Sequence, residues 1–309
     1  MKILFFTGKG GVGKSTLAAA AAWQLSQTHR VLIVSLDPAH NLGDIFNVKV
    51  LGEKRFSDTL RLKEVDLKKL SKAYLAKEIN VLQKTYKYLQ VLNLDTYFSV
   101  LQYSPGIEEY ALLNSIETTI AAPNGFDYII FDTPPTGLTL RFLALPQVTV
   151  TWIDRLTQIR QKILEKCYTI QKIKGPQSDG ATILSYDEKD DDILQKLYEL
   201  KTKYQSLNRV LQGKDCSIVL VFNPDMLSLK ESIRLIEALQ ELNLPLRLLL
   251  HNKLSAESRE TMNRVESKIK HATSVAIKRI QFLPDFQHKT DTGLYHIKED
   301  LTKEIQRMS

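Results

Sequence analysis

The sequence predicts an α/β fold: a doubly wound, mainly parallel sheet that carries an inserted α-helical subdomain. Three observations support it. Strand-like apolar runs alternate with helical stretches, a glycine-rich turn joins the first run to the first helix, and two long helical segments interrupt the alternation. The expected strands are near-continuous apolar runs, as is usual where helices cover both faces of a sheet. They are Lys2–Thr7, Val31–Leu36, Asp127–Asp132, Ser217–Phe222, Arg247–His251 and Arg279–Leu283.

The two long segments, residues 60–122 and 152–211, are expected to be helical because apolar side chains recur there every three or four residues. We expect them to form a helical subdomain at the edge of the sheet, within one domain spanning residues 1–309. In the second segment two apolar stripes should pack in the core, although together they could also frame an apolar groove. The stripes are Ile153, Leu156, Ile159, Ile163, Cys167 and Ile170, and Leu197, Leu200, Tyr204, Leu207 and Leu211, with a loop expected at Lys174–Asp192.

Composition and charge are those of an ordinary globular enzyme. The chain has 309 residues with a formal net charge of +7, which permits an acidic partner surface without establishing one. Its two cysteines, Cys167 and Cys216, make neither a disulfide framework nor a zinc spacing. We expect free thiols, with pairing between the two as the open alternative. The chain enters its first strand at once and has no long apolar run. We therefore expect no signal peptide, no stable membrane insertion and a cytoplasmic location.

A phosphate-binding loop is predicted between the first strand and the first helix. Glycines let backbone N–H groups turn toward a phosphate, and the helix start adds further donors. Lys14 should reach the β- and γ-phosphates, and the Ser15 hydroxyl should ligate Mg²⁺. The pattern predicts binding of a nucleoside triphosphate. The loop consists of Gly8, Lys9, Gly10, Gly11, Val12, Gly13, Lys14, Ser15 and Thr16.

Two carboxylates follow expected strands and are candidates for the chemistry. Asp37 ends the second strand, and Pro38 turns the chain there, so that Asp37 could orient or deprotonate an attacking water. A turn aspartate that caps the next helix is the open alternative. Asp132 follows Ile129-Ile130-Phe131 as a Walker-B aspartate does and should hold Mg²⁺. The loop Thr133–Gly137 could then sense the γ-phosphate.

These stretches resemble a known family. Gly8–Thr16, Asp37–Leu42 and Asp132–Gly137 are similar to the phosphate loop, switch I and switch II of the ArsA family, which includes arsenite-pump ATPases and ATPases that target tail-anchored membrane proteins. Lys9 resembles the signature lysine of the deviant Walker-A loop found there. Weaker similarities continue to the end of the chain: Ser104–Glu109, Asn223–Ser232, His251–Lys253 and Phe282–Asp285.

The resemblance implies roles for particular residues. Lys9 would act in trans on the nucleotide of a second subunit, which makes ATP part of a homodimer interface. Asp37 would be the catalytic acceptor. Asn252 and Pro284 would contact adenine, and Asp225 would touch the nucleoside across the dimer. The implied cofactors are ATP and Mg²⁺.

Departures from the family pattern are equally informative. Eukaryotic targeting members share a zinc ion through a Cys-x-x-Cys motif, but Leu254–Ala276 contains no cysteine, so no zinc is expected. Two distant cysteines do not rebuild a metalloid site, so arsenite binding is not expected either. Targeting members have methionine-rich groove helices. This chain has four methionines and none in its helical segments, which leaves the client open.

The resulting hypothesis is a homodimeric, Mg²⁺-dependent ATPase that opens and closes on a hydrophobic protein client, with no specific nucleic-acid partner. Two alternatives stay open. One is a ParA/MinD-like positioning ATPase that acts on DNA or membrane surfaces. The other is a non-hydrolysing, ATP-dependent scaffold.

Overall fold

The computed structural model describes residues 1–39, 41–50, 52–85, 104–122, 125–174, 191–281 and 295–308. The chain divides into two compact units. The first joins Met1–Leu143 to Leu211–Ser309 and contains the sheet, and the second is Ala144–Val210. No helix in the described ranges is long and apolar enough to cross a membrane.

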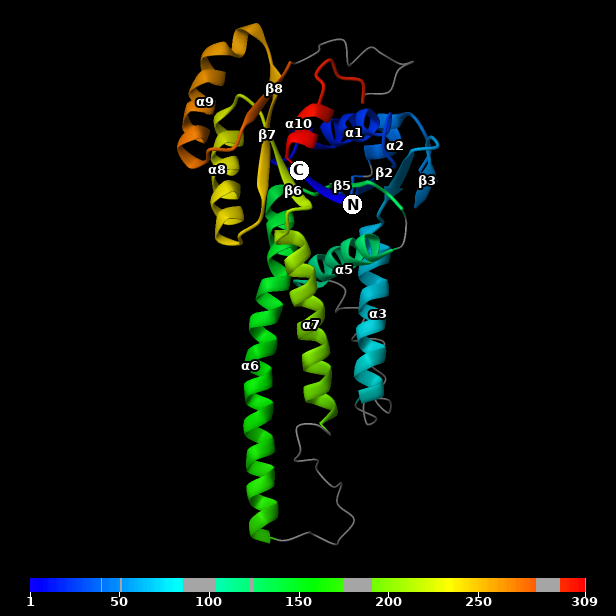
Figure 1. Cartoon of the computed structure of the whole chain (residues 1–309), viewed down its shortest axis with the longest axis vertical. Coiled ribbons are helices and arrows are strands. Elements are labelled where there is room, and N and C mark those ends of the chain that lie inside the picture. The colour runs from blue at the N-terminus through cyan, green and yellow to red at the C-terminus, as the bar shows by residue number, and fades with distance from the viewer. Residues whose placement is uncertain are drawn as a thin grey trace. The chain divides into compact units, whose positions relative to one another are not determined.

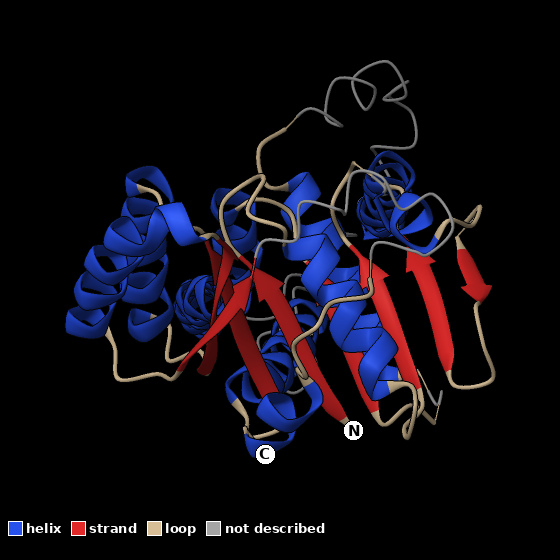
Figure 2. Ribbon diagram, turned by 90° about the horizontal axis from the view of Figure 1, so that it is seen from above, coloured by secondary structure: helices blue, strands red, loops and turns tan. Residues whose placement is uncertain are grey.

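One sheet of eight strands forms the centre of the first unit, in the order β3-β4-β2-β5-β1-β6-β7-β8. All neighbouring strands pair in parallel except β3 and β4, and the arrow of β3 accordingly points against the others in Figure 2. The strands are β1 Lys2–Thr7, β2 Val31–Ser35, β3 Glu53–Arg55, β4 Leu60–Glu64, β5 Tyr128–Asp132, β6 Cys216–Phe222, β7 Leu246–Leu254 and β8 Ile277–Gln281.

Helices lie on both faces of this sheet (Figure 2), so the predicted α/β class with a mainly parallel, doubly wound sheet is confirmed. The helices of the first unit are α1 Lys14–Leu25, α2 Asn41–Phe46, α3 Leu67–Thr85, α5 Ile107–Ala121, α8 Met226–Glu241, α9 Arg259–Ala272 and α10 Thr302–Arg307, with a 3₁₀ turn at Ala256–Ser258. Helix α6, Thr136–Lys174, begins in the first unit and continues into the second, where α7, Asp192–Gln212, begins.

The prediction that the first helical segment starts at residue 60 is wrong. Residues 60–64 form β4, which pairs in parallel with β2 and antiparallel with β3. The reason is visible in the alternation of Leu60, Arg61 and Leu62, because both leucines are fully buried while Arg61 is exposed. Two-residue periodicity of this kind is typical of a strand, and the helical periodicity begins only afterwards, in α3.

The core of the first unit holds the phosphate loop in place from both sides. Phe5 on β1 stacks on Phe131 on β5, with 4.9 Å between ring centroids. On α1 every residue from Leu17 to Ala22 is buried, as is Leu25. Each fully buried large apolar side chain contributes about 1.5–3 kcal/mol relative to exposure. The strand before the loop and the helix after it are therefore both fixed by packing.

The second unit buries little of its apolar surface. The first expected stripe lies on α6 and was expected to be buried. Ile153 is buried, but Leu156, Ile159 and Ile163 are exposed. In the second unit the buried face of α6 carries Ile153 together with Leu164, which the expected stripe did not include. Another face of α6, the long helix in Figure 1, carries an exposed apolar stripe. We call it the α6 stripe; it consists of Val148, Trp152, Leu156, Ile159, Ile163, Ile170 and Ile173.

Candidate functional site

The phosphate loop connects β1 to α1 at the carboxyl edge of the sheet, and two of its glycines are required there. Gly8 has a φ of 148°, and a Cβ on it would lie 2.2 Å from the Val221 carbonyl oxygen. Gly13 has a φ of 94°, and a Cβ would lie 2.4 Å from Nδ2 of Asn252. A side chain at Gly8 would collide with fixed backbone, and one at Gly13 would be strained by the positive φ and would displace the Asn252 amide.

Lys14 is buried in the first turn of α1, and its Nζ donates to the Lys9 carbonyl at 3.3 Å. Burial lowers the pKa of Lys14, while the nearby carboxylates of Asp132, Asp37 and Glu231 raise it. Three acidic groups from separate elements thus act on one ammonium. The structure brings together the two aspartates singled out from the sequence, and a positively charged group sits among them.

Glu231 is the residue of this group that sequence reasoning missed. It lies on α8, and its Oε2 accepts a hydrogen bond of 3.4 Å from the hydroxyl of Thr136. Thr136 is the first residue of α6 and part of the loop expected to sense the γ-phosphate. Only its place within a stretch of family resemblance could have drawn attention to Glu231, because helix spacing gives no sign that it faces Lys14.

Asp132 is the buried carboxylate of the site. Burial raises the pKa of Asp132 to about 7, against the lowering effects of the Ser15 hydroxyl and the Lys14 ammonium. Although Ser15 is near enough to act on it, neither carboxylate oxygen has a hydrogen bond of normal geometry within the described ranges. A buried carboxylate without donors is costly, and a hydrated cation removes that cost. Asp132 and Ser15 therefore fit a Mg²⁺ ion.

Asp37 stands beside Asp132 at the tips of neighbouring strands. The Leu36 amide donates to the Asp132 carbonyl at 2.8 Å and holds the two strand ends together. Oδ1 of Asp37 accepts from the Ala39 amide at 3.0 Å. This is the turn-forming contact that the alternative interpretation requires. The catalytic role of Asp37 stays a prediction.

The remaining candidates lie at different distances from the loop. Asn252 is buried, and its Nδ2 donates to the Val12 carbonyl at 2.8 Å, so its amide contacts the loop itself. Asp225 is the N-cap of α8, where Oδ1 accepts from the Ser228 amide at 2.8 Å. Lys9 is half-buried within the loop. Pro284 lies outside the described residues, as does His40 in the switch I stretch.

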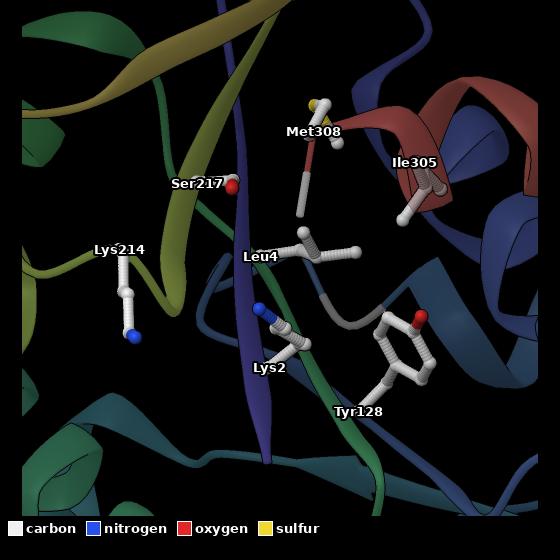
Figure 3. Close-up of a pocket in the computed structure, with 7 residues that line it drawn as sticks. All are labelled: Lys2, Leu4, Tyr128, Lys214, Ser217, Ile305 and Met308. Atoms are coloured by element: carbon white, nitrogen blue, oxygen red, sulfur yellow. The ribbon is translucent and has the colours of Figure 1, made fainter.

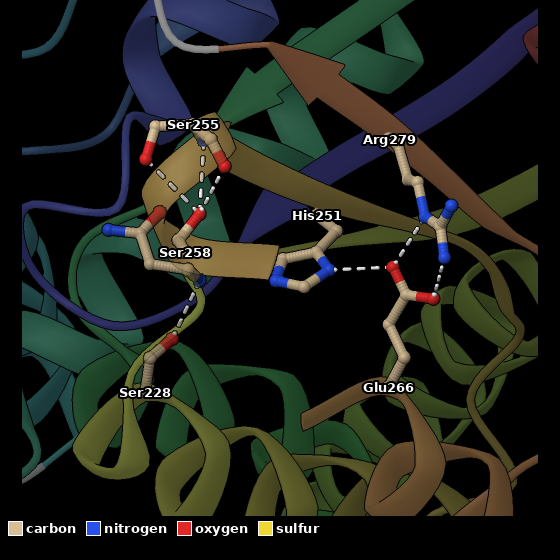
Figure 4. A network of polar contacts seen from close by, with 7 residues as sticks. Ser228, His251, Ser255, Ser258, Glu266 and Arg279 are labelled. Atoms are coloured by element: carbon tan, nitrogen blue, oxygen red, sulfur yellow. Dashed lines mark hydrogen bonds and ion pairs between the residues drawn. The ribbon is translucent and has the colours of Figure 1, made fainter. Parts of the chain in front are cut away.

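A polar network supports the strand end that carries Asn252 (Figure 4). His251 is fully buried on β7, and its Nδ1 lies 2.8 Å from Oε1 of Glu266 on α9. Glu266 also receives two hydrogen bonds from Arg279 on β8, at 2.9 and 2.8 Å. Burial lowers the pKa of His251, and the Arg279 hydrogen bonds lower the pKa of Glu266. A neutral histidine donating to a carboxylate is the consistent arrangement.

A small pocket lies at the other, amino edge of the sheet (Figure 3). Lys2 and Tyr128, the first residues of β1 and β5, and Ser217, the second residue of β6, line it. Ile305 and Met308 at the end of the chain also line it. Ligands of open α/β sheets bind at the carboxyl ends of the strands. The phosphate loop, and not this pocket, is therefore the candidate site.

Comparison with known proteins decides the family. The sequence model of the ArsA ATPases, described as anion-transporting ATPases, matches residues 1–294. The chain belongs to the ArsA family. It is accordingly an ATPase of the ArsA type, and the phosphate loop is where that activity is expected to reside.

Individual relatives are distant but extensive. The chain is 30% identical over 260 residues to a candidate arsenical pump-driving ATPase of Aquifex aeolicus, covering 84% of this chain and 82% of that protein. It is 30% identical over 261 residues to the ATPase get3 of Aspergillus terreus, covering 82% and 73%. A candidate arsenical pump-driving ATPase of Chlorobaculum tepidum is longer. At 30% identity, the matched region spans 82% of this chain but only 61% of that relative.

Proposed function

We propose that this ArsA-type ATPase works as a homodimer in which Mg²⁺-dependent ATP hydrolysis opens and closes a binding face for a hydrophobic protein client. The α6 stripe is the observation that carries the client part of this proposal. Its members are strongly exposed, with Trp152 at 66%, Ile159 at 56% and Ile173 at 78%. A row of exposed apolar side chains along one helix is typical of a protein-binding or membrane-binding site.

For hydrolysis we assign the roles expected from the sequence. Lys14 and the loop amides would hold the phosphates. Ser15 and Asp132 would hold Mg²⁺, which would supply positive charge at the phosphates. Asp37 orients the water that attacks the γ-phosphate in line with the leaving oxygen. Lys9 of the second subunit completes the charge around the transferred group. ATP as the fuel agrees with the cytoplasmic location expected from the sequence.

The chain offers a direct covalent route from nucleotide to client. Asp132 ends β5, the loop Thr133–Pro135 follows, and α6 begins at Thr136. The same helix then carries the α6 stripe through the second unit. A rearrangement of the loop after loss of the γ-phosphate would therefore act on the first turn of the client-binding helix.

An arsenite cargo is not part of this proposal. Cys216 is buried on β6, where burial raises the pKa of its thiol to about 12, so this thiol is enclosed and unreactive. Cys167, the second cysteine, lies on α6 in the other unit. The apolar stripe favours a hydrophobic segment of a protein, such as the membrane anchor that the family resemblance implies.

Client binding can be tested with a fluorescent peptide of about 20 apolar residues, the length of a membrane-spanning helix. The Asp37→Asn protein, which should lose about 10²–10⁴-fold in turnover but keep ATP, serves as the trapped state. Adding Trp152→Ser and Ile159→Ser should weaken peptide binding at least about tenfold, because two large apolar contacts are lost.

Leu227→Ser is the matched control. Leu227 is also 66% exposed, but it lies on α8 in the first unit, away from the α6 stripe in sequence. Equal peptide affinity in the stripe variant and the control would remove the α6 stripe from client binding.

The homodimer has its own test. Lys9→Ala should weaken dimerisation in the presence of Mg²⁺ and ATP, because a trans contact to the partner's phosphates is lost. Light scattering after size-exclusion chromatography measures the dimer fraction with and without nucleotide. A dimer that forms equally well in the variant would return Lys9 to the role of a solvent-facing lysine.

One observation favours the positioning alternative. Arg155, Lys162 and Lys166 are exposed and lie along one edge of the α6 stripe. An apolar stripe with a basic flank is suited to anionic membrane surfaces. Pelleting with vesicles that contain phosphatidylserine, lost at high salt and in Lys162→Glu, would favour this alternative over a protein client.

A further inference from the structure

We propose that Lys253 is a positioning residue for the triphosphate. Its ammonium fixes the orientation of a peptide group in the phosphate loop, and with Asn252 it holds the loop in the shape that receives phosphate. The inference rests on nucleotide binding at that loop. Lys253 lies in the His251–Lys253 stretch of family resemblance, but neither that resemblance nor the loop motif gives it a role.

Two consecutive side chains hold two consecutive loop residues. Nζ of Lys253 donates to the Gly11 carbonyl at 2.8 Å, and Nδ2 of Asn252 donates to the Val12 carbonyl at 2.8 Å. Both come from the carboxyl end of β7, more than 200 positions further along the chain. Neither bond is a by-product of local chain geometry.

A β-bulge aims these side chains at the loop. The pairing of β7 with β8 shifts register between His251 and Leu254, so residues 252 and 253 are displaced from the ladder. Bulges re-aim side chains and are common beside functional sites. The ladder on the near side of the bulge is anchored by the buried contact of His251 with Glu266. A fixed strand therefore presents the displaced pair.

Lys253 also adopts a backbone conformation that lysine disfavours. Its φ is +56°, in the left-handed region that glycine and asparagine occupy more readily. Such strain persists where the surroundings determine it, and it concentrates at functional sites. Glycine or asparagine would relax the backbone, but neither has a side chain long enough to replace the ammonium at Gly11. The strained residue is thus the one that can make the loop contact.

The contact controls which way a loop amide faces. In a trans peptide the carbonyl and the N–H point in opposite directions, so a Gly11 carbonyl held by Lys253 turns the Val12 N–H to the other side. There the Val12 N–H makes a long contact of 3.5 Å to the Lys9 carbonyl, which Lys14 Nζ also reaches, at 3.3 Å. An amide donor and the phosphate-binding ammonium therefore face the same side, as a bound phosphate requires.

Three variants separate positioning from folding. Lys253→Met removes the ammonium, Lys253→Asn removes it while accepting a positive φ, and Lys253→Arg keeps a cation. Calorimetry in the presence of Mg²⁺ should show that Lys253→Met and Lys253→Asn bind ADP about 5–20-fold more weakly than wild type, as expected for the loss of one charge-assisted hydrogen bond. Lys253→Arg should restore part of this affinity. The KM for ATP should rise by a similar factor, with kcat within about twofold, because a preorganising contact acts on binding.

Lys54→Met is the matched control, since Nζ of Lys54 also donates to a backbone carbonyl, that of Lys49, at 3.2 Å. Thermal midpoints should be unchanged or higher in Lys253→Asn. Unchanged ADP affinity in Lys253→Met and Lys253→Asn would overturn the inference. A loss of ADP affinity accompanied by a lowered thermal midpoint in all three variants would overturn it too, because it would point to a folding defect. If the wild-type protein itself bound no ADP, nucleotide binding at the loop would fail first.

Discussion

Asp132 and Asp191 are both buried aspartates, but their environments shift the pKa values of the two carboxyl groups in opposite directions. Burial raises the pKa of Asp132 to about 7, and no hydrogen bond of normal geometry reaches its carboxylate within the described ranges. Arg160 lowers the pKa of Asp191 through hydrogen bonds of 2.6–3.2 Å, and the Leu194 amide adds another at 2.8 Å. The comparison shows how a carboxylate that stabilises the fold, with its partners supplied by the chain, differs from one whose surroundings suit a bound cation.

The difference follows from what each carboxylate has to hold. Asp191 fixes the start of α7 and ties it to α6, so every partner is supplied by the chain. Asp132 sits at the end of a buried strand beside the phosphate loop, where a cation with its water shell is the partner that the chain leaves to be supplied. Perturbed pKa values concentrate at functional sites, and of these two aspartates it is Asp132, beside the phosphate loop, that the chain leaves without a partner of its own in the described residues.

The largest expected effect concerns Asp132. Asp132→Asn should reduce ATP turnover about 100-fold, because the group that we assign to Mg²⁺ loses its charge. Folding should be retained. Phosphate release at saturating ATP measures the effect, and Asp127→Asn, next to the start of the same strand, is the control. Full turnover in Asp132→Asn would show that this carboxylate does not hold the metal.

A second prediction compares apolar side chains of the two units. Ile33→Ala, in the middle of β2, should lower the free energy of unfolding by about 3–4 kcal/mol, because a fully buried side chain leaves a cavity. Ile159→Ala on the α6 stripe should change it by no more than about 0.5 kcal/mol. Urea denaturation followed by circular dichroism measures both. A large loss at Ile159 would mean that the α6 stripe is part of a core.

The carboxylate that stabilises the fold gives the third prediction. Arg160→Met should lower the free energy of unfolding by about 2–3 kcal/mol, because Asp191, with 4% of its side chain exposed, loses its ionic partner. Arg155→Met, on the exposed side of the same helix, should cost far less. Thermal unfolding compares the two variants. Turnover per folded molecule should be unaffected in both, and a selective loss of turnover in Arg160→Met would assign this ion pair to coupling instead of stability.

The smallest effect is a pH dependence at His251. Burial lowers the pKa of His251 below its ordinary 6.5, so the unfolded chain binds more protons in the range beneath 6.5. Stability from this group is therefore present above pH 6.5 and is lost as the pH falls, with a slope of at most about 1.4 kcal/mol per unit. Glu266 and Arg279, which face the ring, should keep their charges between pH 5 and 7.

Substitution isolates that slope. His251→Gln should flatten the decline in stability between pH 7 and 5, measured by chemical denaturation at each pH. His271→Gln, at the exposed end of α9, should leave it unchanged. An identical slope in wild type and His251→Gln would assign the decline to other groups.

Helices α1 and α6 show where prediction from sequence reached its limit. Both are rich in apolar residues, yet α1 is covered by the sheet while α6 leaves one apolar face exposed. Periodicity indicates which residues share a face, but it does not say whether another element covers that face. Helix α6 has apolar residues on two faces, and only the one with Ile153 and Leu164 is covered.

The amino-acid sequence by itself determined the α/β class, the central strands and the phosphate loop, because these depend on local signals: apolar runs, glycines that a turn requires, and a lysine and serine at fixed spacing. Tertiary structure alone decided the rest. Glu231 faces Lys14, and Lys253 and Asn252 hold the loop, only because α8 and a bulge on β7 meet the loop from far along the chain. Such contacts follow from packing between distant segments, which no local pattern encodes.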